Sequence, residues 1–122
     1  MIRIKADVRI RVYSRPIQVM LECLMEMDRI TDRPTDIVIT SIYRKPTTKP
    51  SRHSTHEAVD VRSWSFPSFR SKMEFRQRLD WLLNYPNKQY TVIYEPTLHY
   101  ANGKVKRTEH FHAQVKKGVT HV

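Results

Sequence analysis

The sequence has one cysteine, Cys23, and two glycines among its 122 residues. A single cysteine cannot form an internal disulfide, and without cysteine pairs the chain cannot build a cysteine-ligated structural zinc site. The scarcity of glycine excludes the glycine-rich loops that cradle phosphates in nucleotide-binding proteins. Positive charge, in contrast, is abundant. The formal net charge of +10 predicts attraction to polyanions such as nucleic acids or anionic cell-wall polymers.

A long apolar run is also missing at the N-terminus. The first twelve residues carry a charge at every second or third position. This pattern is incompatible with the apolar core of a signal peptide and with a membrane span. We therefore expect a protein that is synthesised in the cytoplasm without a signal peptide and has no membrane span.

The length of the chain suits one domain with a modest core. Hydrophobic residues make up 39% of the sequence and charged residues 28%, as is typical of a soluble globular protein. We expect a single, monomeric domain over residues 1–122, in which residues 116–122 form a flexible tail.

The first half of the chain contains one clear change of hydrophobic period. Apolar and polar residues alternate over residues 2–13, which predicts a half-exposed strand. Over residues 16–30 the apolar residues follow a helical period, and Pro34 ends the predicted helix. Residues 37–43 and 57–62 read as strands, separated by a loop rich in proline and threonine.

The second half predicts another helix and a group of strands. Ser65 or Ser68, with Pro67, begins a helix that runs to about Asn84, with Phe69 among its apolar positions. Strands are expected at 89–94, 98–101, 104–107 and 109–115, with Asn102-Gly103 as a hairpin turn. The resulting fold class is α+β, with a small, mainly antiparallel sheet and two main helices.

Two short motifs about fifty residues apart carry the groups that bind metals. The first is Ser51-x-His53 followed by Asp60, and the second is Glu109-His110-Phe-His112. Together they offer two imidazoles and a carboxylate to one ion, with a second acid and a spare imidazole nearby. Three protein ligands, an open position for water and a general base are the components of a catalytic zinc site.

Strand geometry supports this grouping. Side chains alternate along a strand, so His110 and His112 point to one face and Phe111 to the other. Two neighbouring strands can therefore direct Asp60 and His112 to one point, and His53 can fold back from the preceding loop. A His-x-His pair on a strand is more often two solvent-facing residues. Asp60 is the stronger indication, because a carboxylate in an apolar strand is costly to bury unless it is paired or coordinated.

The pattern Ser-x-His-x6-Asp with a late Glu-x-x-His resembles the zinc D-alanyl-D-alanine carboxypeptidase and L-alanyl-D-glutamate endopeptidase family. These peptidases act on peptidoglycan and share a hedgehog-like fold. The segment Ser41-Ile-Tyr-Arg44 is similar to the Ser-x-x-Arg of that family, so the resemblance runs from about Ile37 to Val115. It implies one Zn²⁺ per chain in a cell-wall hydrolase of the bacteriophage endolysin type, which is released to the wall by another factor or carried in the virion.

The resemblance also implies roles for individual residues. His53, Asp60 and His112 would be the zinc ligands, and the catalytic groups would be Glu109 as the general base, His110 as a group that supports the transition state, and Arg44 as a clamp on the substrate.

One residue departs from the family. The family has glycine where this chain has His56, which changes the loop or supplies a rival ligand to His53.

Three points stay open from the sequence. Glu109 lies an odd number of residues from His112, so a regular strand would separate them and make His110 a rival base. The positive charge and the tyrosines near the predicted sheet also suit a small nucleic-acid-binding protein, although no binding motif is found. An inactive, metal-bearing binding domain of the same fold is the third alternative.

Overall fold

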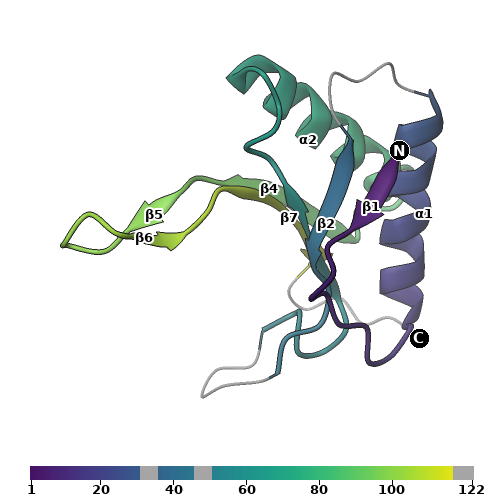
Figure 1. Ribbon diagram of the computed structural model, residues 1–122. Coiled ribbons are helices and arrows are strands. Elements are labelled where there is room, and N and C mark those ends of the chain that lie inside the picture. The colour runs from purple at the N-terminus through teal and green to yellow at the C-terminus, as the bar shows by residue number, and fades with distance from the viewer. Residues whose placement is uncertain (31–35, 46–50, 117–122) are drawn as a thin grey trace.

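The computed structural model of the chain describes residues 1–30, 36–45 and 51–116. Five strands form a sheet in the spatial order β1-β2-β3-β7-β4, and two helices pack against it (Figure 1). β1 and β2 run parallel, whereas the other neighbours in this sheet are antiparallel. The elements are β1 (Ile2–Ile4), α1 (Arg15–Ile30), β2 (Ile37–Ser41), β3 (Ala58–Arg62), α2 (Phe69–Asn84), β4 (Tyr90–Glu95) and β7 (His110–Val115). The predicted α+β class is confirmed, with two helices and a mainly antiparallel sheet.

The two faces of the central strands carry different side chains. Val59 and Val61 of β3 and Phe111 of β7 belong to the hydrophobic core. Because successive strand residues alternate faces, Asp60 and its neighbours on β7 lie on the other face. The helices contribute to the same core with Ile17, Met20, Leu24 and Met27 of α1 and with Phe75, Leu79 and Leu83 of α2. The helices therefore cover one face of the sheet and leave the other for polar groups.

Helix α2 begins where a capping box forms. The Ser68 side chain accepts a hydrogen bond from the backbone N–H of Ser71, and the Ser71 side chain bonds back to the backbone of Ser68. This selects Ser68 over Ser65 as the residue that precedes the helix. The expectation that Phe69 lies on the apolar face was wrong, because its side chain is 65% exposed and only meets the Tyr94 ring at an edge.

The predicted strand over residues 2–13 was also wrong in length. β1 contains only three residues, and its alternating pattern does not continue into a buried face, since Ile4, Ile10 and Val12 are all exposed. β1 is an edge strand with one neighbour, β2, and the chain turns away after it through a hydrogen bond from Val8 N–H to the Lys5 carbonyl. Alternation predicts a buried face only where another surface is available to cover it.

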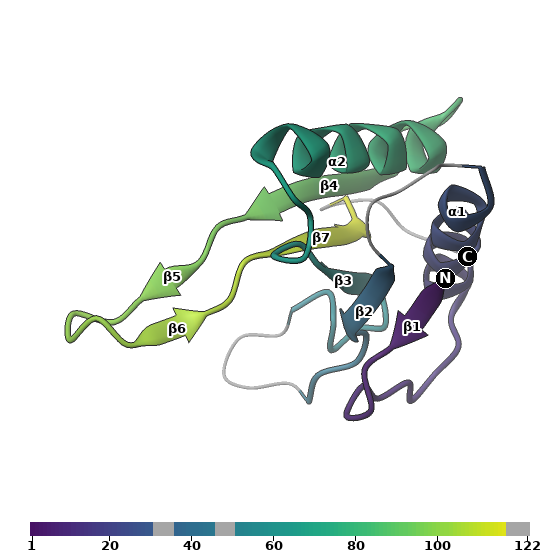
Figure 2. The same ribbon diagram turned by 45° about the horizontal axis from the view of Figure 1, so that its top comes forward.

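A two-stranded arm projects from the end of the sheet between β4 and β7 (Figures 1 and 2). Its strands are β5 (Leu98–His99) and β6 (Val105–Arg107), joined around the predicted Asn102-Gly103 turn. Gly103 has a φ of +84°, which glycine adopts without strain. Both strands are shorter than predicted, and the last strand of the sheet begins at His110, so Glu109 precedes it.

The C-terminal end of the described chain is tied to the sheet. Lys116 N–H donates to the Gln89 carbonyl at 2.9 Å, so this residue continues the pairing of β7 with β4 by one step. The rest of the predicted tail lies outside the described residues. Within the described part of the chain, no helix has the length and apolar character needed to cross a membrane.

Phe111 tests the core of this arrangement. It is 1% exposed, and its ring contacts those of Phe66, Phe75 and Tyr94. We expect Phe111→Ala to lower the free energy of unfolding by about 3–5 kcal/mol, measured by urea denaturation. Phe69→Ala removes the same atoms from an exposed helix position and should cost less than about 1 kcal/mol. Equal losses for the two variants would contradict the described core.

Candidate metal centre

The site begins with two residues on adjacent central strands. Asp60 of β3 and His112 of β7 are direct cross-strand partners, so their side chains leave the sheet side by side on the face away from the core. The position of each strand inside the sheet keeps this pair buried, with Asp60 only 5% exposed. The expectation that neighbouring strands bring Asp60 and His112 together is met.

The loop before β3 supplies the third residue. A backbone hydrogen bond from the Glu57 N–H to the Arg52 carbonyl closes the loop at 2.8 Å. The side chains of these two residues also form an ion pair at 3.0 Å. The Glu57 carbonyl in turn accepts from Val115 N–H of β7. Held at both ends, the loop directs His53 inward, where its side chain is almost fully buried.

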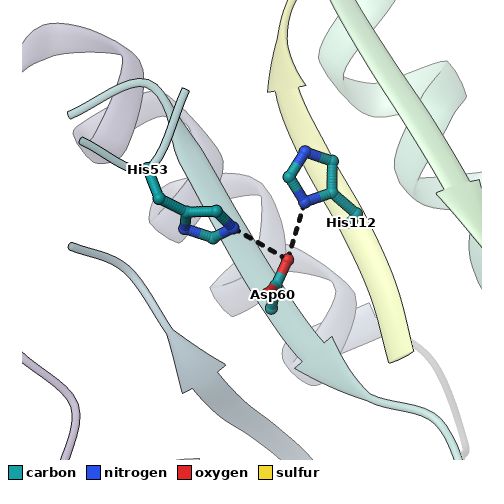
Figure 3. Close-up of side chains that lie close together, drawn as sticks. All are labelled: His53, Asp60 and His112. Carbon is teal, nitrogen blue, oxygen red and sulfur yellow. Dashed lines mark hydrogen bonds and ion pairs between the residues drawn. The ribbon is translucent and has the colours of Figure 1, made fainter. Parts of the chain in front are cut away.

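Figure 3 shows how the three side chains converge. His53 Nε2 lies 3.1 Å and His112 Nδ1 lies 2.7 Å from the same oxygen, Asp60 Oδ1. The three ligand atoms all lie within 4.8 Å of one another. Such a group could hold one metal ion, and its two nitrogens and one oxygen suit zinc.

Hydrogen bonds on the outer side of each ring fix the neutral tautomers. His53 Nδ1–H donates to the Ile42 carbonyl at 2.9 Å, and His112 Nε2–H donates to Gln114 Oε1 at 2.7 Å. In the neutral form, the remaining nitrogen of each ring therefore presents a lone pair to Asp60. Two lone pairs facing a carboxylate repel it unless a cation, either a proton or a metal ion, lies between them. The arrangement thus matches metal ligands that are oriented by outer hydrogen bonds.

The electrostatics of the pair agree with this demand for positive charge. Burial by itself raises the pKa of Asp60, but the hydrogen bonds and charges of His112 and His53 outweigh it and lower that pKa well below its ordinary value. Burial lowers the pKa of His112, and the hydrogen bond to Asp60 reverses this effect and raises it above the usual 6.5. Without a metal ion, the proton on His112 is the cation that this carboxylate retains.

His56 takes no part in this cluster. Its φ is +60°, in the left-handed region that glycine adopts more readily than histidine, so the loop adopts a backbone here that would suit glycine. The imidazole stacks on the Tyr43 ring, with 5.0 Å between the ring centroids. His56 therefore packs against Tyr43, and His53 is the histidine that meets Asp60.

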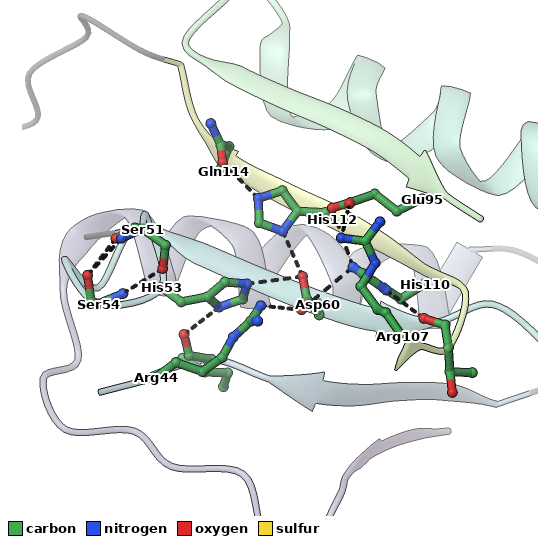
Figure 4. A network of polar contacts seen from close by, with 12 residues as sticks. Arg44, Ser51, His53, Ser54, Asp60, Glu95, Arg107, His110, His112 and Gln114 are labelled. Carbon is green, nitrogen blue, oxygen red and sulfur yellow. Dashed lines mark hydrogen bonds and ion pairs between the residues drawn. The ribbon is translucent and has the colours of Figure 1, made fainter. Parts of the chain in front are cut away.

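Arg44 is brought to the site as a neighbour of the ligand. One of its terminal nitrogens donates to Asp60 Oδ2 at 2.8 Å, on the oxygen that the histidines leave free. This bond fixes the plane of the carboxylate, so that Oδ1 faces both imidazoles (Figure 4). Arg44 also lines the adjacent cleft, where a side chain that acts as a substrate clamp would have to lie.

His110 lies on the same face, one step along β7 from His112. Its Nδ1–H donates to the Thr108 carbonyl at 2.9 Å, which leaves Nε2 unprotonated in the neutral ring. That nitrogen is 3.4 Å from Glu95 Oε1 and 3.9 Å from Asp60 Oδ2. Glu95 also pairs with Arg107 at 2.8 Å.

Glu95 and Gln114 were not anticipated from the sequence. Gln114 could have been found, since it lies two residues beyond His112 and shares its face. Glu95 could not, because its role depends on the pairing of β4 with β7, which puts it directly opposite His110. Together with His110 and His112, Glu95 forms a second group with ligand spacing that overlaps the first.

Glu109 makes a separate set of contacts. Its carboxylate accepts from Ser63 Oγ at 3.0 Å and pairs with Lys72 of α2 at 2.5 Å. Burial raises its pKa, but Lys72 and Ser63 outweigh that effect and hold the pKa below its ordinary value. Glu109 reaches the rim of the cleft beside Asp60, but no hydrogen bond or ion pair joins it to the three candidate ligands among the described residues.

Comparison with known proteins does not identify a family or a function for the chain. No known protein family matches the sequence, and neither the curated proteins nor the solved structures contain a match. The candidate site therefore depends on its own chemistry.

Metal content tests the candidate ligands directly. We expect the wild type to bind about one transition-metal ion per chain and Asp60→Asn to bind it more than about 100-fold more weakly, because the substitution removes the anionic ligand and keeps its shape. Elemental analysis after dialysis against a weak chelator measures this. His56→Ala is the matched control and should retain the ion. Equal content in wild type and Asp60→Asn would exclude the site, and loss in His56→Ala alone would assign the ligand to His56.

The pH dependence of metal binding follows from His112. The ion needs the unprotonated Nδ1, and the raised pKa of His112 means that protons compete at higher pH than for an ordinary histidine. As the pH is lowered, we expect the apparent zinc affinity to begin to fall while the pH is still above 6.5. The affinity should then decline by about tenfold per pH unit as His112 becomes protonated. Competition with a chromophoric chelator across this range measures the affinity. An affinity that stays constant down to about pH 6 would contradict the raised pKa.

Proposed function

We propose that the protein is a zinc-dependent peptidase that hydrolyses amide bonds in peptidoglycan stem peptides. The observation that carries the proposal is the inward-facing set of His53 Nε2, Asp60 Oδ1 and His112 Nδ1, in which the two neutral rings direct lone pairs at a buried carboxylate. Asp60 also lines an open cleft, through which substrate and water could reach an ion at the cluster, and such access suits a catalytic metal better than a structural one.

The resemblance of the two motifs to peptidoglycan peptidases supports the substrate class and a hedgehog-like fold for the domain. The net charge of +10 suits a protein that works on an anionic cell wall. The protein would then act at the wall after release from the cytoplasm, or as part of a virion, in the manner of an endolysin.

In this reaction, zinc at the site would lower the pKa of a bound water towards ~7 and polarise the scissile carbonyl. The chain's own groups do the rest. Asp60 is kept in orientation by Arg44, and the remaining nitrogens of Arg44 are available in the cleft to stabilise negative charge on the reacting carbonyl oxygen. The outer bonds from His53 and His112 place the single proton of each neutral ring on its outer nitrogen, so that the inward nitrogen can bind the ion.

The general base is better assigned to His110 than to Glu109. His110 Nε2 is unprotonated in the neutral ring and lies on the same face as the ligands, 3.9 Å from Asp60 Oδ2. Glu95 lies close to the same nitrogen, so it can stabilise the imidazolium that forms when His110 accepts a proton. Glu109, held by Lys72 and Ser63, instead anchors the start of β7 to α2.

Muropeptide digestion tests the function. We expect the zinc-loaded protein to release stem-peptide fragments that mass spectrometry identifies, and a strong chelator should abolish this activity until zinc is restored. His110→Ala should lose roughly 10²–10⁴-fold in turnover while it keeps its metal, because the loss is that of a general base. Glu109→Gln, the matched control on the neighbouring residue, should stay within about tenfold of the wild type.

Two results would contradict these assignments. Intact muropeptides after incubation with the metal-loaded wild type would exclude the peptidase. An inactive Glu109→Gln variant beside an active His110→Ala variant would return the role of base to Glu109.

A further inference from the structure

A cleft of about 380 Å³ opens beside the candidate metal centre. Asp60 and His110 form its inner wall, and Trp64 forms part of its rim. Cationic side chains outnumber carboxylates among the residues that line it. The charged members are Lys5, Arg44, Arg62, Arg107, Asp60 and Glu109. Its excess of positive charge suits an anionic group on whatever occupies the cleft.

Most of these cations already have an anionic partner. Arg44 donates to Asp60 and Arg107 to Glu95, each at 2.8 Å. Lys5 makes a longer and exposed pair with Asp7 at 3.7 Å. Because such pairs satisfy part of each charge, these three side chains are weaker candidates for binding an external anion.

Arg62 differs from the other cations. No ion pair joins it to a carboxylate among the described residues, whereas its buried Nε without a hydrogen-bond partner is a feature that it shares with Arg107. Its guanidinium instead lies over the Trp64 ring, 4.5 Å from the centroid. A guanidinium stacked on an aromatic ring is held in one orientation while its edge stays free to bind a carboxylate through two parallel hydrogen bonds.

The register of the sheet brings this arginine close to the proposed chemistry. Arg62 lies two residues beyond Asp60 on β3 and directly opposite His110 on β7. Two strand residues span about 7 Å, which is also the length of about two residues of an extended peptide. An anion bound at Arg62 would therefore lie within about two residues of a carbonyl at the metal.

We infer that Arg62, held by Trp64, binds a carboxylate of the substrate and so selects peptides that carry one near the scissile bond. This inference deepens the proposed function and rests on it. A peptidoglycan stem peptide carries two such groups, the α-carboxylate of its D-glutamate and its C-terminal carboxylate. Both present the same chemistry to Arg62, and an experiment can distinguish them.

The test uses the zinc-loaded protein and the pentapeptide L-Ala-γ-D-Glu-L-Lys-D-Ala-D-Ala in four forms: unmodified, amidated at D-glutamate, amidated at the C-terminus, and amidated at both. Trp81→Phe removes the other tryptophan, which lies exposed on α2, so that Trp64 reports binding by stopped-flow fluorescence before turnover. Amidation of the group that Arg62 engages should weaken binding roughly 10- to 100-fold. The amide that causes this loss identifies the source of the carboxylate.

Variants separate a specific contact from general charge. Arg62→Gln in the same background should weaken binding of the unmodified peptide by the same factor and abolish the difference between carboxylate and amide, as expected when both changes remove one contact. Arg78→Gln removes the same charge from an exposed position on α2 and should leave both values unchanged. If Arg62→Gln and amidation each weaken binding and their combined effect is the product of the two, the inference is overturned, because the two changes then remove different contacts. The absence of any peptide binding would overturn it as well.

Mass spectrometry of the same samples separates this inference from the proposed function. Cleavage of all four peptides with equal binding would support the peptidase and overturn the role of Arg62. Carboxylate-dependent binding that Arg62→Gln abolishes, without cleavage of any peptide, would support the role of Arg62 and contradict the peptidase.

Discussion

The pairing of β3 with β7 is the constraint on which the rest of the structure depends. Its register sets Asp60 against His112 and Arg62 against His110 on one face, and Val61 against Phe111 on the other. A shift of one residue along either strand would send the polar groups into the core and the apolar groups into the cleft. The free energy gained by burying Val61 and Phe111 therefore also maintains the geometry of the site.

The buried carboxylate of Asp60 determines the electrostatics around this pairing. It is approached from two directions, with the His53 and His112 rings at one oxygen and a donor nitrogen of Arg44 at the other. A buried anion without such partners would be strongly destabilising. A bound metal ion would use the two histidines as ligands and leave the bond from Arg44 in place. Folding and metal binding therefore both require the same neighbours around Asp60.

Much of this arrangement could be predicted from the sequence, because it depends on local periodicity. The alternation of Phe111 with two histidines predicts which side chains share a face, and the helical spacing of Ile17, Met20 and Leu24 predicts the buried stripe of α1. The predictions failed where a pattern required a partner that local sequence does not specify. The long strand predicted over residues 2–13 lacked a covering surface.

Long-range pairing accounts for the functional residues that the sequence did not reveal. Glu95 becomes a neighbour of His110 only when β4 pairs with β7, and Arg62 faces the cleft only because β3 occupies the centre of the sheet. Lys72 similarly meets Glu109 because the first turn of α2 lies beside the residue that precedes β7. In each case the two residues lie on different elements, and no spacing along the chain links them.

The spatial order of the strands has a consequence for folding. β7 is the last strand of the described residues, yet it lies inside the sheet between β3 and β4. Until it is inserted, β4 has no neighbour in this sheet, and the cluster has neither His110 nor His112. The site is therefore incomplete in any form of the chain in which β7 has not joined the sheet. In a hydrolase, such an order would keep activity from preceding the native fold.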